Sequence, residues 1–118
     1  MSIKIKRGVQ PDSLMLMAAL ANTAEIWSLD VTVTSGSDGK HRQGSRHYTD
    51  QAIDVRSKEL FETVDEKLQF LKRVIERLGP ADKVQTPTGP GYQTKDGRWL
   101  GILENIGLPL EHFHLERN

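Results

Sequence analysis

The stretch Gln51-Ala-Ile-Asp-Val-Arg56 alternates polar and apolar side chains. Side chains of a strand point alternately to its two faces, so Ala52 and Asp54 share one face and Ile53 and Val55 the other. The stretch therefore predicts a strand that carries the carboxylate of Asp54 on the face opposite its β-branched residues.

A helix is predicted shortly after this strand. Thr63-Val-Asp-Glu66 is a capping box, in which Thr63 and Glu66 can each bond the other's free backbone N–H. Gly79 and Pro80 are typical of a helix end. Between these signals, apolar residues recur at helical spacing, namely Leu68, Leu71, Val74, Ile75 and Leu78.

A second helix is predicted nearer the N-terminus, over residues 11–27, because Pro11 and Asp12 open a stretch with helical periodicity. The β-branched run Val31-Thr-Val-Thr34 predicts a strand, and the Gly and Ser content of residues 35–44 predicts a long loop. The expected apolar side of the helix consists of Leu14, Met17, Ala18, Ala21, Ala24 and Trp27.

The C-terminal third predicts further strands at residues 83–86, 99–103 and 113–116, and its Pro- and Gly-rich run at 87–97 predicts an exposed loop. Helices and strands do not alternate as a wound parallel sheet requires. We therefore expect an α+β fold with a mainly antiparallel sheet and two principal helices. The 118 residues are expected to form one domain, residues 1–118.

Composition excludes several classes of function. Sixteen basic and sixteen acidic side chains balance, so no long-range field favours nucleic acid or an anionic membrane. Cysteine is absent, which excludes disulfides and thiolate metal sites. Charges alternate through residues 1–8 where a signal peptide needs an apolar run, and residues 14–20 are too few to cross a bilayer. We expect cytoplasmic synthesis without membrane insertion.

All four histidines fall in two short segments, His41 with His47 and His112 with His114. On a strand, His112 and His114 project from the same face. Without cysteine, a zinc ion would be held by imidazole and carboxylate, and a catalytic zinc takes three protein ligands. His47, Asp54 and His114 could form such a set. Taken singly, each of these residues is more often a solvated surface group.

Two segments resemble signatures of the D-alanyl-D-alanine metallopeptidases, the M15 peptidases. Ser45-Arg-His47-Tyr-Thr-Asp-Gln-Ala52-Ile-Asp54 is similar to the Ser-X-His-X-X-Gly-X-Ala-X-Asp signature, and Glu111-His-Phe-His114 is similar to the Glu-X-X-His signature. Asp50 stands where the family has glycine, and Asp is among the few residues that tolerate a left-handed turn. The resemblance implies the fold shared by D-Ala-D-Ala metallopeptidases and hedgehog domains.

The resemblance also implies roles for individual residues. The zinc ligands would be His47, Asp54 and His114, and Glu111 would be the general base for a zinc-activated water. A basic residue upstream of the first ligand would bind the substrate carbonyl. Lys40 is our choice for it and Arg42 the alternative. His112 could add a further hydrogen-bond donor.

Strand geometry restricts where Glu111 can lie. Residues three apart on a regular strand face opposite sides, so Glu111 and His114 cannot share a face of one strand. Pro109 discourages strand pairing, so we expect Glu111 on the preceding loop and the strand to begin near His112. Glu116, which shares the face of His114, is the second candidate for the base.

The implied function is hydrolysis of peptidoglycan stem or cross-link peptides, as a carboxypeptidase or an endolysin-like endopeptidase. A monomer released to the cell wall or carried in a phage particle fits this function. An ordinary cytoplasmic dipeptidase fits equally. The alternative is a zinc-stabilised binding or virion module of the same fold without catalysis, or histidines that hold no metal at all.

Overall fold

The computed structural model describes residues 3–5, 14–35 and 52–118. None of the helices that it describes is long and apolar enough to cross a membrane. The elements, in chain order, are β1 (Ile3–Ile5), α1 (Leu14–Ile26), β2 (Val31–Ser35), β3 (Ala52–Arg56), α2 (Val64–Glu76), β4 (Ala81–Thr86), β5 (Gly89–Thr94), β6 (Trp99–Glu104) and β7 (His112–Arg117).

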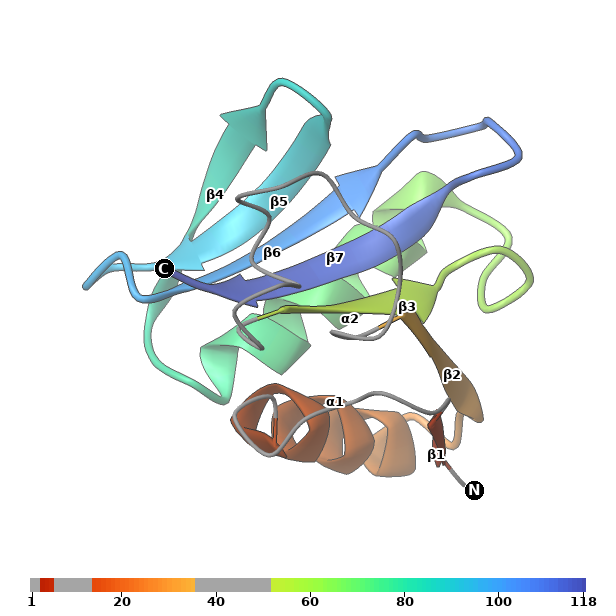
Figure 1. Cartoon of the computed structure of the whole chain (residues 1–118), viewed down its shortest axis with the longest axis horizontal. Helices are drawn as coiled ribbons and strands as arrows, with labels where there is room; N and C mark the ends of the chain where they lie inside the picture. Colours follow the sequence, from red (N-terminus) through yellow and green to blue (C-terminus); the bar gives the residue numbers. More distant parts are fainter. Residues whose placement is uncertain (1–2, 6–13, 36–51) are drawn as a thin grey trace.

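The strands form one sheet in the order β1-β2-β3-β7-β6-β5-β4. Strand β1 pairs in parallel with β2, and all the other pairs are antiparallel. Helices α1 and α2 lie together on one side of this sheet (Figure 1). The prediction of an α+β fold with a mainly antiparallel sheet and two helices is confirmed.

The core lies between the helices and the inner face of the sheet. Ile53 and Val55 of β3 are completely buried, as their alternation with Asp54 predicts. Phe70 of α2 is central, because its ring lies 5.6 Å from that of Trp27, 5.7 Å from Phe61 and 5.9 Å from Phe113, measured between centroids. Aromatic pairs at such separations stabilise a core beyond the area that they bury.

Helix α2 begins where the capping signal predicts. Thr63 is the N-cap, and its hydroxyl accepts the backbone N–H of Glu66 at 3.2 Å while donating to the Glu66 carboxylate at 3.0 Å. The side chains that α2 buries are Lys67, Phe70, Leu71, Val74 and Ile75. Four of these five are apolar and pack against the sheet. The fifth, Lys67, belongs to the polar network described below.

The prediction of an exposed loop over residues 87–97 is wrong, because β5 occupies Gly89–Thr94. Glycine there serves a close approach between strands. A Cβ on Gly91 would lie 2.0 Å from the carbonyl oxygen of Gly101 in β6. The absence of a side chain therefore permits strand pairing at a position where composition alone suggests irregular backbone.

The predicted buried face of the first helix is also wrong in part. Leu14 is 57% exposed and Ala18 is exposed, whereas the buried residues of α1 are Leu16, Met17, Ala19, Leu20, Thr23 and Ala24. Residues 14–20 are apolar on every side of the helix. Periodicity selects a face only where apolar and polar residues contrast, and this stretch offers no contrast.

Leu14 and Leu16 provide a matched test of this corrected face. We expect Leu16→Ala to lower the free energy of unfolding by about 2–5 kcal/mol, because it leaves a cavity in the core. Leu14→Ala should change it by less than about 0.5 kcal/mol. Urea denaturation followed by circular dichroism measures both, and equal losses in the two variants would contradict the burial of one leucine and the exposure of the other.

Candidate functional site

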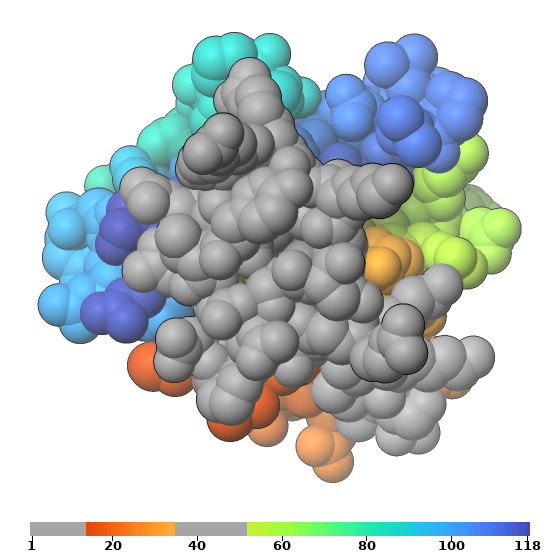
Figure 2. Space-filling view, in the orientation of Figure 1, coloured from red at the N-terminus to blue at the C-terminus, as the bar shows by residue number. Residues whose placement is uncertain are grey.

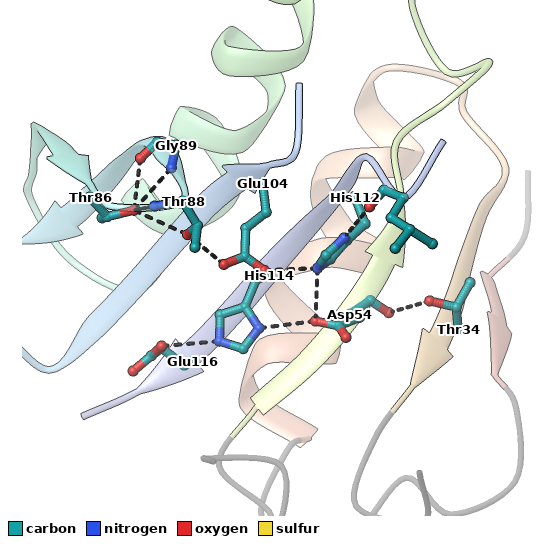
Figure 3. Close-up of polar contacts among 10 residues, drawn as sticks. Thr34, Asp54, Thr86, Thr88, Gly89, Glu104, His112, His114 and Glu116 are labelled. Atoms are coloured by element: carbon teal, nitrogen blue, oxygen red, sulfur yellow. Dashed lines mark hydrogen bonds and ion pairs between the residues drawn. The ribbon is translucent and has the colours of Figure 1, made fainter. Parts of the chain in front are cut away.

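Ionisable side chains gather on the sheet face that points away from the helices. Asp54 of β3 lies directly opposite His114 of β7, and Glu104 of β6 lies directly opposite His112 of β7. Glu116 follows on the same face of β7. Figure 3 shows these side chains converging from the three adjacent strands. Strand alternation places Phe113 and Leu115, which separate them along β7, in the core.

His114 is held between two carboxylates. Its Nδ1 lies 2.9 Å from Oδ1 of Asp54, and its Nε2 lies 3.0 Å from Oε1 of Glu116 (Figure 3). Burial acts to lower the pKa of His114, but the hydrogen bonds to Asp54 and Glu116, together with the charges of Asp54 and Glu104, outweigh it and raise the pKa to about 10. In this arrangement the imidazole is a cation that donates to both neighbours.

His112 is likewise a donor at both ring nitrogens. Its Nε2 lies 2.8 Å from Oε1 of Glu104, and its Nδ1 lies 2.7 Å from the backbone carbonyl of Leu110. A carboxylate and a carbonyl can only accept, so both nitrogens carry hydrogen. The hydrogen bond to Glu104 raises the pKa of His112 against the opposing effect of burial. Both N–H groups of His112 are therefore engaged, and what it offers a neighbouring group is its positive charge.

Glu104 links this site to the turn between β4 and β5. Its second oxygen, Oε2, accepts the hydroxyl of Thr88 at 2.6 Å. The hydrogen bond from His112 and that from Thr88 lower the pKa of Glu104 although burial acts to raise it. Sequence analysis did not single out Glu104. Its place one strand away, opposite His112, depends on pairing that a single sequence does not show.

Glu111 lies just before β7, where strand geometry predicts it. The carboxylate is 7% exposed and has three donors. Oε2 forms an ion pair with Lys67 of α2 and accepts the hydroxyl of Ser57 at 2.8 Å, and Oε1 accepts the backbone N–H of Gly107 at 3.2 Å. Burial acts to raise the pKa of Glu111, but these hydrogen bonds outweigh it and lower the pKa. The carboxylate is therefore ionised and firmly held.

A cleft of about 580 Å³ is lined by three of these residues, Asp54, Glu111 and His112. In the space-filling view, residues 105–111 lie beside those that follow β3, at the upper right (Figure 2). Its lining combines basic, acidic and apolar side chains. The lining residues are Thr34, Asp54, Arg56, Lys58, Glu59, Asn105, Pro109, Leu110, Glu111 and His112.

The structure brings together three of the residues that the sequence predicts for the site, Asp54, His112 and His114, and it places Glu111 in the adjoining cleft. The other predicted site residues, Lys40, Arg42 and His47, lie outside the described residues, as does Asp50. Sequence reasoning missed Glu104, Ser57 and Lys67, whose partners lie on other elements, 8, 54 and 44 residues away in the chain.

The chemistry of the donor set fits a zinc ion. Asp54 offers a carboxylate oxygen and His114 an imidazole nitrogen, both within reach of one point between them. Residues 3–5, 14–35 and 52–118 by themselves contain no group of three His, Asp or Glu side chains that could hold a metal. The predicted set takes its third ligand, His47, from outside these ranges.

The ion pair of Glu111 with Lys67 has a testable effect on stability. Because the pKa of Glu111 is lowered in the folded protein, the pair stabilises the fold at pH values above the pKa of an unfolded glutamate. This contribution is lost as the pH falls through the pKa of Glu111 in the folded protein. We expect Glu111→Gln to lower the free energy of unfolding at neutral pH by about 3–5 kcal/mol, because Lys67 stays buried without its charge partner.

Urea denaturation at neutral pH and in steps below about pH 5 measures the free energy of unfolding of both proteins. As the pH falls over this range, wild type should lose more stability than Glu111→Gln. The double variant Glu111→Gln, Lys67→Met is the control, because it removes both charges and should recover part of the loss. Parallel pH dependence in wild type and Glu111→Gln would contradict the role of the pair.

Comparison of the chain with protein-family models, with curated proteins and with solved structures finds no match. The geometry of the sheet face, together with the two sequence signatures, is therefore the basis for assigning a function.

Proposed function

We propose that this protein is a zinc-dependent peptidase that hydrolyses peptidoglycan stem or cross-link peptides. The observation that carries the proposal is the 2.9 Å approach of Asp54 Oδ1 to His114 Nδ1 across directly paired strands. These two residues come from two separate signatures that resemble those of the M15 peptidases. Their meeting at one point is what a shared metal ligand set requires.

In this proposal zinc is held by His47, Asp54 and His114. A bound zinc ion supplies Lewis-acid polarisation of a peptide carbonyl and makes a water molecule acidic near neutral pH. The protein's own contribution is to hold the surrounding groups. His112 adds a positive charge from the next position on the same face of β7, and its hydrogen bonds to Glu104 and to the Leu110 carbonyl fix its ring. A fixed positive charge of this kind stabilises negative charge that develops nearby.

The cleft supports a peptide substrate. Arg56 lies two residues beyond Asp54 on the same face of β3, and Lys58 follows it on the rim. Neither forms an ion pair with another described residue, so both can attract the carboxylates of an acidic peptide. Pro109 and Leu110 add apolar surface to the same cleft. Peptidoglycan as the source of the peptide follows from the resemblance to the M15 peptidases.

The hydrogen bonds that hold the Glu111 carboxylate favour a second candidate function. This alternative is a zinc-stabilised module that binds peptidoglycan or serves in a virion without catalysis. A general base must accept a proton from water, and the two oxygens of Glu111 already accept hydrogen bonds from three donors. The lowered pKa of Glu111 also makes it a weaker base. Catalysis by Glu111 requires at least one of these donors to move.

Metal content is the first test of the proposal. Mass spectrometry of the purified wild-type protein should find about one zinc per chain, and His114→Ala should lose it. Glu111→Gln should keep both the zinc and the fold. Absence of zinc from wild type, even after zinc is supplied at neutral pH, would contradict both candidate functions.

Digestion of purified peptidoglycan separates the two candidates. An enzyme should release peptides or amino acids, and Glu111→Gln should release at least about a hundredfold less, as expected for loss of general base catalysis. A wild-type protein that binds zinc and sediments with peptidoglycan but releases nothing is a binding module. Circular dichroism at the assay temperature controls for the stability loss expected of Glu111→Gln.

The cation expected to bind the substrate carbonyl can be identified by paired substitution. We expect Lys40→Met to lower kcat by about 10²–10³ and Arg42→Met to have a much smaller effect, because one preorganised cation contributes a few kcal/mol to the transition state. Initial rates on a fixed peptidoglycan preparation measure both. A large loss in Arg42→Met alone would assign the role to Arg42 instead, and small losses in both variants would assign it to neither.

A further inference from the structure

Glu116 has a defined place beside one of the proposed zinc ligands. It lies two residues after His114 on β7, so both side chains leave the same face of the strand. The side chain of Glu116 is 16% exposed and that of His114 is 13% exposed, and Oε1 of Glu116 lies 3.0 Å from Nε2 of His114. The contact is thus a mostly buried hydrogen bond between neighbours on one strand (Figure 3).

The two ring nitrogens of His114 face different partners. Nδ1 faces Asp54, the other described member of the proposed ligand set, and Nε2 faces Glu116. A metal shared by Asp54 and His114 must therefore lie on the Nδ1 edge of the ring. Glu116 lies at the opposite edge. This position does not suit a general base, which has to reach the open side of a metal.

A histidine that binds metal through one nitrogen needs the other nitrogen to carry hydrogen. A carboxylate that accepts this N–H fixes the tautomer, orients the ring and makes the bound nitrogen a stronger ligand. We propose that Glu116 is a positioning residue that accepts the Nε2–H of His114 and so orients the ring with Nδ1 toward the zinc that Asp54 and His114 would share. This inference rests on the proposed zinc site, and it adds Glu116 as a residue that orients one of the zinc ligands.

Glu104 provides a matched control. It is also a glutamate on the polar sheet face, and it also bonds the Nε2 of a histidine, at 2.8 Å. Its partner His112 is not one of the proposed zinc ligands. Glu104→Gln and Glu116→Gln each remove one negative charge near the site, so the long-range attraction for a cation falls in both. A larger loss in Glu116→Gln than in Glu104→Gln therefore reports the direct hydrogen bond between Glu116 and His114.

Zinc affinity is the measurement, by calorimetric titration of metal-free protein with zinc at neutral pH. We expect Glu116→Gln to bind zinc about 10–100-fold more weakly than wild type, and Glu104→Gln to lose much less. Glu116→Asp is the second variant, because it keeps the charge but shortens the reach, and it should also lose affinity. Circular dichroism of each metal-free variant confirms that it is folded.

The outcomes separate this inference from the proposed function. If wild type binds no zinc, the proposed function fails and the role of Glu116 fails with it. If wild type binds zinc and the two glutamine variants lose affinity equally, the zinc site stands and the role of Glu116 is overturned. Full zinc affinity in Glu116→Gln together with lost peptidase activity would also overturn it, and would make Glu116 the base.

Discussion

The pairing of β3 with β7 is the constraint on which the rest of the structure depends. Register places Asp54 opposite His114 and Val55 opposite Phe113, so the same ladder fixes the polar site and the core. A slip of one residue would turn Phe113 and Leu115 toward the polar face and both histidines into the core. The apolar residues of β7 therefore hold the register that the polar residues use.

Much of the fold could be predicted from local sequence patterns. The parts that could not be predicted each have a physical explanation. The capping box at Thr63 and the alternation of residues 52–56 identify α2 and β3, because these signals act within a few residues. The apolar start of α1 lacks the contrast that would reveal its buried face. Strand β5 could not be predicted, because Gly91 is required by the close approach of the Gly101 backbone on β6, and a single sequence does not show which strands are neighbours.

Some residues of the candidate site could likewise be predicted from the sequence, and others could not. Asp54, His112 and His114 could be predicted, because period-two spacing on a strand and the order of the two signatures are properties of the sequence. Lys67 and Ser57 could not, since they meet Glu111 only through tertiary packing. The placement of Glu111 before β7 follows from spacing, whereas the three donors that hold its carboxylate follow from the fold.

Strand β7 comes after the six other strands in sequence but lies in the middle of the sheet, between β3 and β6. During synthesis, the strands made earlier therefore form two separate sets with exposed inner edges, β1-β2-β3 and β6-β5-β4. Asp54 meets its histidine partner only across 60 residues of chain. A chain that ends before residue 112 thus lacks both the strand that joins the two sets and the histidine that contacts Asp54. The junction of the two sets and the contact between Asp54 and His114 should therefore form together, late in synthesis.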